Sequence, residues 1–168
     1  MAISWLLNLY KYFIANKPSI VFDVIDDKVI LGTDIGLVSF NLKDKKGIIL
    51  GIANDKSIAW GIADQLNHLA ANLAFSYVND SIKKRVIPLA KNCNSEMVFE
   101  CDVKNDESID NFFSEISKKW PSIDFVVHSI AFSDKNELKG GYIETSRENF
   151  INTLNVSCYS FTAICQRA

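Results

Sequence analysis

Residues 51–61, with the sequence GIANDKSIAWG, carry the strongest indication of fold class in this 168-residue chain. They follow the apolar run 48–50 and precede a segment whose apolar residues recur at helical spacing. Gly51 allows a sharp turn off a strand, Ser57 can cap a helix beside an anion, and Gly61 would allow close packing. The spacing is not G-x-G-x-x-G. On its own it leaves a phosphate site and an ordinary strand-to-helix turn equally open.

Downstream of this turn, short apolar runs alternate with longer segments of helical spacing. Strands are expected at 47–50, 73–77, 97–101 and 125–128, and helices at 57–69, 81–91, 106–120 and 150–168. This alternation predicts an α/β fold, a Rossmann-like doubly wound parallel sheet with strand order 3-2-1-4, truncated after about four strands. The fourth strand is then an apolar edge, so we expect the isolated chain to be less stable than a complete sheet.

The predicted helices have recognisable faces. In the first helix the apolar residues share one face: Ile58, Ile62, Leu66 and Leu69. In the second helix the segment 83–85 is basic and is expected to face solvent, whereas Ile82 and Val86 are apolar. The third helix carries apolar residues at 109, 112, 113 and 116 and is stopped by Pro121.

Residues 1–40 do not follow the alternation. We expect an N-terminal extension of unknown role there, followed by the main domain at 41–168. The segment 5–13 has the spacing of a short amphipathic helix, and it is too short and too polar to span a membrane. A docking helix and upstream sequence with no part in the fold remain equal alternatives. Residues 19–42 favour strands and turns, with Asp26-Asp27 and Gly32 as turn signals.

Composition excludes several function classes. Eighteen Lys and Arg against twenty Asp and Glu give a net charge of −2, which provides no field to gather nucleic acid. With 48% hydrophobic and 23% charged residues, the chain has the composition of a soluble globular protein. The cysteines, at 93, 101, 158 and 165, have no zinc-site spacing. No metal is expected, and free thiols in a reducing cytoplasm are favoured.

Several collinear motifs resemble the bacterial enoyl-acyl carrier protein reductases of type II fatty-acid synthesis, a divergent branch of the short-chain dehydrogenase/reductases. Besides GIANDKSIAWGIA, the resemblance rests on five segments: LAFSYVND from Leu73, KKRVIPLA from Lys83, CDVKNDESID from Cys101, DFVVHSIAFSDKNELKGGYIETS from Asp124 and NVSCYSFTA from Asn155. It covers residues 41–168 and favours the phosphate-site interpretation of the turn at Gly51.

The resemblance implies an NADH site. Its cofactor contacts fall on six residues: Gly51, Ser57 and Ile58 at the pyrophosphate and adjoining ribose, Asp102 and Val103 at the adenine, and Ile130 near the nicotinamide. Ser133 matches a position beside the substrate. From the residues alone, Asp102 could instead be a helix cap or turn former.

Other positions depart from the family pattern or are assigned no chemistry. Val78 stands where the family often has a polar residue against the ribose, and the absence of a basic residue there favours NADH over NADPH. His128 is expected to help shape the cofactor pocket, His68 to lie at the surface, and Asn155 to pack within its helix. No catalytic role is assigned to either histidine.

The implied reaction is hydride transfer from NADH to a trans-2-enoyl thioester carried by an acyl carrier protein. In the family a Tyr-x6-Lys pair stabilises the enolate and holds the cofactor ribose, and it lies beyond the helix with which this sequence stops. No catalytic residue is therefore expected in this chain. Tyr142 and Tyr159 have Asn149 and Gln166 at the lysine position. The complete enzyme would be a cytoplasmic homotetramer. An inactive NADH-binding remnant and one half of a split reductase are the alternatives.

Overall fold

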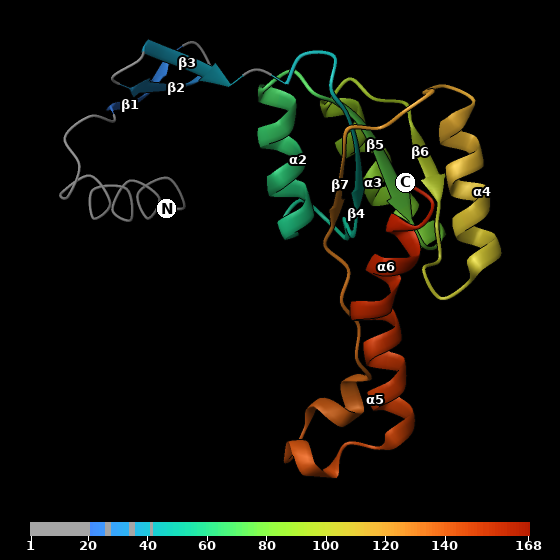
Figure 1. The fold of residues 1–168 in the computed structure, drawn as a ribbon. Helices are drawn as coiled ribbons and strands as arrows, with labels where there is room; N and C mark the ends of the chain where they lie inside the picture. The colour runs from blue at the N-terminus through green and yellow to red at the C-terminus, as the bar shows by residue number, and fades with distance from the viewer. Residues whose placement is uncertain (1–20, 26–27, 34–35, 41) are drawn as a thin grey trace. The chain divides into compact units, whose positions relative to one another are not determined.

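The computed structural model describes residues 21–25, 28–33, 36–40 and 42–168. The chain divides into two compact units, Met1–Leu42 and Lys43–Ala168. In the first unit, an antiparallel meander is formed by β1 (Val21–Ile25), β2 (Lys28–Thr33) and β3 (Gly36–Phe40) (Figure 1).

The strands predicted for this first unit are therefore confirmed, but the turn signal at Gly32 was wrong. Gly32 lies within β2 and is paired with Val21 of β1. Its neighbours in β2 have the β-branched and aliphatic character that favours a strand, and one glycine does not interrupt such a ladder. The predicted turn at Asp26-Asp27 and the predicted helix at 5–13 lie outside the described residues.

The second unit is built on a parallel sheet. Its strands are β4 (Lys46–Leu50), β5 (Asn72–Tyr77), β6 (Val98–Glu100) and β7 (Phe125–His128), in the order β6-β5-β4-β7. All three pairings are parallel, and their register brings Leu50 beside His128 and Tyr77 beside Glu100. The predicted order 3-2-1-4 is confirmed. Within the described part of the chain, β7 pairs with β4 alone, as expected for an open edge.

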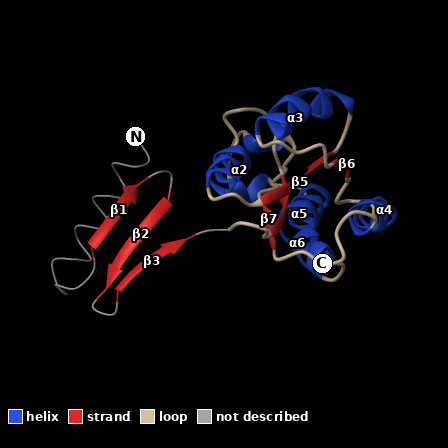
Figure 2. Cartoon of the chain, turned by 90° about the horizontal axis from the view of Figure 1, so that it is seen from above, coloured by secondary structure: helices blue, strands red, loops and turns tan. Residues whose placement is uncertain are grey.

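Helices cover both faces of this sheet. They are α2 (Ile58–His68), α3 (Asp80–Asn92), α4 (Asp106–Ser117) and α6 (Ser160–Cys165), and a further helix, α5 (Arg147–Leu154), precedes α6. Figure 2 shows α2 and α3 on one face, and α4 and α6 on the other. A π-helical turn, Asn155–Tyr159, joins α5 to α6. Two 3₁₀ turns, Lys135–Leu138 and Tyr142–Glu144, precede α5, and this region projects beyond the carboxyl ends of the strands (Figure 1).

The predicted apolar face of α4 forms part of the core. Ile109, Phe112 and Ile116 are all at most 2% exposed and pack in one cluster with buried residues of β4, β5 and α6. The helix begins where the side chain of Asn105 accepts hydrogen bonds from the backbone N–H groups of Glu107 and Ser108. This cap supplies partners for two of the donors that a helix start leaves unpaired.

Helix α2 packs with a different face from the one its apolar residues predicted. Ala59 and Ala63 are fully buried, while Ile58 is 77% exposed and Ile62 is 37% exposed. The distance between packed elements depends on the side chains at the contact, so methyl groups let α2 lie close to the sheet. Gly61 was expected to allow close helix–strand or helix–cofactor packing; close packing on a strand is wrong, because a Cβ atom there would meet no protein atom within 4 Å.

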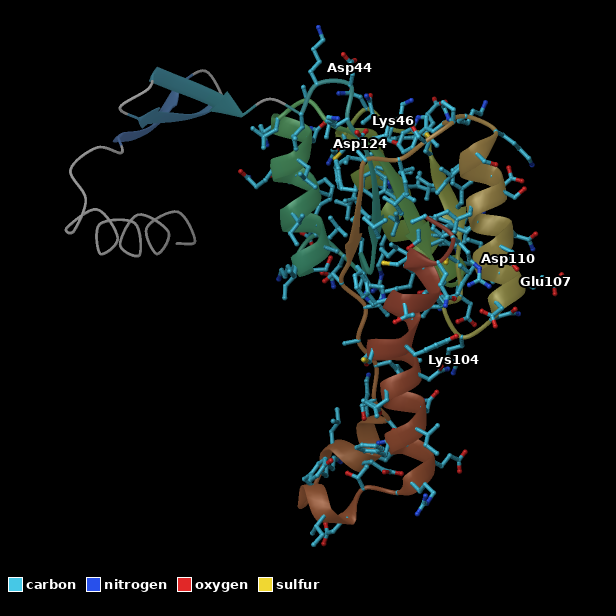
Figure 3. The ribbon with its side chains drawn as sticks, in the orientation of Figure 1. Asp44, Lys46, Lys104, Glu107, Asp110 and Asp124 are labelled. Carbon is cyan, nitrogen blue, oxygen red and sulfur yellow. The ribbon has the colours of Figure 1, made fainter. Side chains whose placement is uncertain are left out.

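An ion pair ties the amino ends of β4 and β7 together. Asp124 accepts hydrogen bonds from the Lys45 ammonium at 2.7 Å and from the Lys46 backbone N–H at 2.8 Å. The hydrogen bond with Lys45 lowers the pKa of Asp124 and raises that of Lys45. Figure 3 shows Asp124 and Lys46 together at this end of the sheet, away from Lys104, which follows β6.

The four cysteines differ in burial, and two of them have a raised pKa. Cys93 and Cys101 are buried, whereas Cys158 and Cys165 are exposed, and all four are free thiols. Burial raises the pKa of Cys101 to about 12, with a contribution from the nearby Asp102 charge, and raises that of Cys93 to about 11. The thiolate is the reactive form, so burial makes Cys93 and Cys101 less reactive than an exposed thiol at the same pH.

We therefore expect iodoacetamide at pH 8 to modify Cys158 and Cys165 in the native chain. Within the same reaction time, Cys93 and Cys101 should stay unmodified. Mass spectrometry of tryptic peptides measures the extent at each site. In 6 M urea all four thiols should react, which controls for the reagent. Modification of Cys101 at the rate of Cys158 in the native chain would contradict the burial.

Candidate functional site

A cleft of about 390 Å³ lies at the carboxyl ends of the four parallel strands. Its walls are the segments that end or follow each strand: 51–53 after β4, 76–78 at the end of β5, 101–104 after β6 and 129–132 after β7, with Ile82 and Val156. In open α/β sheets, ligands bind at this edge, where the strand order reverses. The parallel register described above is what brings these four segments together.

The absence of a side chain at Gly51 lets the segment 51–53 lie against the segment 129–132. Its φ is +102°, a left-handed conformation that favours glycine. A Cβ atom at this position would lie 2.1 Å from the carbonyl oxygen of Ser129. Two backbone segments therefore approach each other so closely that a side chain cannot fit between them.

Ser57 occupies the N-cap position of α2, but its hydroxyl does not cap the helix. The hydroxyl instead donates a hydrogen bond to the carbonyl of Asn54 within the turn. The expectation of a hydroxyl cap was wrong: the Ser57 side chain is turned toward the Asn54 carbonyl, and its oxygen accepts no N–H of the first helical turn. Neither Ser57 nor Ile58 lines the cleft, and both lie at the start of α2.

Asp102 and Val103 line the cleft as one tight turn. One carboxylate oxygen of Asp102 accepts the backbone N–H of Lys104 at 3.0 Å, and the Asp102 N–H donates to the Ser108 hydroxyl at 2.9 Å. Asp102 is thus both a turn former and a wall residue. Lys104 also lines the cleft, and its ammonium lies 5.9 Å from the ring centroid of Phe132 across from it.

The end of β5 forms a largely apolar part of the wall. Val78 is 46% exposed and lines the cleft beside Tyr77. The ammonium of Lys83 lies 5.1 Å from the centroid of the Tyr77 ring. Lys83 is half-buried, so its predicted solvated position is corrected: the aromatic face attracts the cation toward the sheet.

In the segment after β7, residues 129–132 line the cleft, whereas Ser133 contacts α5. Ile130 lines the cleft, as its predicted role requires. Ser133 does not line it. Its hydroxyl oxygen accepts hydrogen bonds from the Asn149 amide and the Thr153 hydroxyl, each at 3.2 Å.

The two histidines lie outside the cleft lining. His128 Nε2 is 2.7 Å from the Ser160 hydroxyl, and burial lowers the pKa of His128. Exposed His68, at the end of α2, places Nδ1 2.8 Å from the carbonyl oxygen of Asp64. Among the described residues, no group of His, Cys, Asp or Glu could hold a metal ion.

Sequence reasoning missed several wall residues: Tyr77, Lys104, Phe132 and Val156. The first three follow or end predicted strands, so the rule that sites lie at strand carboxyl ends could have found them. Val156 could not be found this way, since it comes from a helix distant in sequence.

The chain contains the Tyr-x6-Lys spacing itself, although not at the position of the family's pair. The Tyr-x6-Lys spacing occurs at Tyr10 and Lys17, outside the described residues, and at Tyr77 and Lys84. Lys84 is exposed on α3. Both occurrences precede the position of the family's pair, which the resemblance places after the last helix.

The parallel order β6-β5-β4-β7, the helices on both faces and the cleft at the carboxyl edge define a Rossmann-like α/β domain. The family model described as "Enoyl-(Acyl carrier protein) reductase" matches residues 51–168. The chain belongs to this reductase family.

Individual relatives agree with this assignment. The chain is 50% identical over 127 residues to "Enoyl-[acyl-carrier-protein] reductase [NADH] 1" of Rhizobium meliloti, covering 76% of the chain and 47% of the relative. It is 49% identical over 127 residues to "Enoyl-[acyl-carrier-protein] reductase [NADH] FabI" of Rickettsia bellii, with 76% and 48% coverage. The chain thus spans about half the length of the curated relatives it matches.

Solved structures give the same result. The crystal structure of FabI from Candidatus Liberibacter asiaticus is 55% identical, with a TM-score of 0.75, covering 77% of this chain and 50% of that one. The reductase from Anaplasma phagocytophilum, solved in complex with NAD, is 50% identical with a TM-score of 0.73, covering 76% and 49%.

Proposed function

We propose that residues 41–168 are the dinucleotide-binding part of an NADH-dependent enoyl-acyl carrier protein reductase, and that the cleft binds NADH. The observation that carries this is the meeting of Gly51, Asp102, Val103 and Ile130 in one cleft at the strand carboxyl ends. These are four of the six residues expected to contact the cofactor. The relatives named above act with NADH by name, and one was solved with NAD.

The residues of the cleft suit a dinucleotide. Gly51 keeps the wall segments 51–53 and 129–132 side by side, and the first turn of α2 has no side-chain cap on its N–H groups. We assign these groups, with Ser57 and Ile58, to the pyrophosphate and adjoining ribose. The Asp102 carboxylate can accept from the adenine amine, beside the Val103 backbone, and Ile130 borders the nicotinamide. When bound, NADH supplies the hydride.

The reaction itself is proposed for the whole protein. Its substrate would be a trans-2-enoyl thioester on an acyl carrier protein, with Ser133 beside it. The enolate would be stabilised by the family's Tyr-x6-Lys pair, which the resemblance places in the half of the relatives that this chain does not span. We further propose a homotetramer that acts in the cytoplasm, with no part in nucleic-acid binding. The described residues contain no helix long and apolar enough to cross a membrane. Residues 1–40 remain an extension without an assigned role.

Titration of the 168-residue chain with NADH, followed by nicotinamide fluorescence, tests the proposal. We expect saturable binding with a Kd between about 1 μM and 1 mM, the range in which KM values of enzymes usually fall. Asp102→Asn keeps the acceptor for the Lys104 N–H but loses the charge, and should weaken binding by several-fold. Asp44→Asn is the matched control: Asp44 is exposed at the other end of the sheet, and asparagine tolerates its positive φ (Figure 3).

Absence of saturable binding up to 2 mM NADH would contradict the proposal, as would equal weakening by Asp102→Asn and Asp44→Asn. Adding enoyl thioester to the NADH complex separates the alternatives for the chain alone. Binding without NADH oxidation is expected both for a remnant and for half of a split enzyme. Oxidation restored by a second chain that carries the tyrosine and lysine would identify the split enzyme.

A further inference from the structure

We propose that the π-helical turn Asn155–Tyr159 positions the cleft wall at 129–132, with Ser157, Ser160 and His128 as positioning residues. This inference rests on the proposed NADH site and adds to it residues that do not themselves touch the cofactor. It is carried by hydrogen bonds at both ends of the wall segment, all from one helix.

The turn changes the normal pairing of the helix backbone. The Ser160 N–H donates to the carbonyl of Asn155, five residues earlier, whereas an α-helix would pair it with Val156. The Ser160 hydroxyl donates to the Val156 carbonyl instead, at 2.6 Å. Val156, whose backbone this bond holds, is 5% exposed and lines the cleft. The side chain of Ser160 therefore replaces a backbone bond beside the site.

The same hydroxyl contacts the end of β7. Its single proton is used on Val156, so at 2.7 Å it must accept from His128, whose Nε2 carries the proton. Ser160 is fully buried, and the His128 ring also meets Phe161 edge to face, with centroids 5.6 Å apart. His128 is the last residue of β7, so the wall segment that starts at Ser129 is held at its first end.

Ser157 holds the other end. The backbone N–H of Phe132 donates to the Ser157 hydroxyl oxygen at 3.0 Å, and that hydroxyl donates to the Phe132 carbonyl at 3.3 Å. Both backbone polar groups of Phe132 thus pair with one side chain. Ser157 lies in the π-helical turn and Ser160 begins α6, so one continuous helical segment carries both attachments. Residues 129–131, which line the cleft, lie between the two attachments.

The experiment compares Ser157→Ala with Ser157→Thr, which keeps the hydroxyl, and with Ser117→Ala as the matched control. Ser117 is exposed and donates to a backbone carbonyl of its own helix, α4, at 2.9 Å. Three quantities are measured: amide hydrogen exchange of 129–132 without NADH, the Kd for NADH, and the melting temperature. The whole 168-residue chain is used throughout.

We expect Ser157→Ala to speed exchange in 129–132 and to raise the Kd for NADH, each by about three- to tenfold, the factor that one hydrogen bond supplies. Ser157→Thr should restore both values. The melting temperatures of Ser157→Ala and Ser117→Ala should agree, because Ser157 is only half-buried. Exchange of α4 should not change in Ser157→Ala, and exchange of 129–132 should not change in Ser117→Ala.

Unchanged exchange in 129–132, or faster exchange with an unchanged Kd, overturns the proposal. So does a fall in melting temperature that Ser157→Thr does not rescue. If the wild-type chain does not bind NADH, the proposed function is refuted. The exchange measurement still shows whether Ser157 holds the wall segment, because it is made without cofactor. If Ser157→Ala does not fold, the pair His128→Leu and His128→Gln replaces it at the other end. Glutamine keeps an N–H donor for Ser160, so only leucine should speed exchange, and equal effects overturn the proposal.

Discussion

Replacing Gly51 with alanine is expected to abolish detectable NADH binding and to lower the free energy of unfolding by about 1–3 kcal/mol. The new Cβ would lie 2.1 Å from the Ser129 carbonyl oxygen, and the backbone at φ +102° is one that alanine rarely adopts. The atoms nearest to the new Cβ, the carbonyl oxygen and carbon of Ser129, belong to the backbone, so no side-chain rotation relieves the clash. The segments 51–53 and 129–132 must separate, and both are walls of the cleft.

Fluorescence titration with NADH and urea unfolding measure the two effects. Gly61→Ala is the matched control, because a Cβ atom there meets nothing within 4 Å and the residue lies inside α2. It should leave NADH affinity unchanged and stabilise the chain by up to about 1 kcal/mol through its helix propensity. If Gly51→Ala bound NADH as well as Gly61→Ala does, the close approach of the two segments would not matter to the site.

The second large effect is expected from Phe112→Ala, which should cost about 3–5 kcal/mol of unfolding free energy. Phe112 is 1% exposed in the core cluster under α4. Its ring meets Phe99 and Phe113 edge to face, with centroids 6.4 and 5.5 Å away. Truncation removes these contacts and leaves a cavity that the sheet and helix cannot fill without moving.

Urea unfolding followed by circular dichroism gives the free energy for Phe112→Ala. The matched control is Phe150→Ala on α5, since Phe150 is 43% exposed and the same atoms are lost from a partly solvated site. Its cost should stay below half of that for Phe112. Equal costs at the two positions would show that the α4 cluster is not the main core of this unit.

The topology of the second unit could be predicted because each signal was local. Apolar runs of four or five residues, helical spacing and short connections suffice to predict alternating strands and helices, and few sheet orders satisfy such connections. The strand boundaries agree with the structure to within a few residues, and β7 agrees throughout. The fold class followed from this pattern, and four of the six cofactor residues that the family resemblance predicts line the cleft.

The packing face of α2 could not be predicted in the same way. Hydrophobicity ranks Ile58 above Ala59, but the burial of Ala59 and the exposure of Ile58 are set by how closely the helix approaches the sheet. Similarly, Ser57 has the chemistry of a cap, and only the shape of the turn directs its hydroxyl to Asn54. In both cases, small differences in the position of the backbone decide which of two adjacent residues is buried, or which group a side chain contacts.

By itself the sequence determined the order of elements, the parallel sheet and the resemblance to the reductase family, and it predicted a site at the strand carboxyl ends, where the cleft lies. Only the tertiary structure decided that Gly51 lies against Ser129, that Lys104 lies over Phe132, and that Val156 lines the cleft. The physical reason is range. Strand and helix signals depend on residues within a few positions of one another, whereas these contacts join residues more than 20 positions apart, and packing alone brings such residues together.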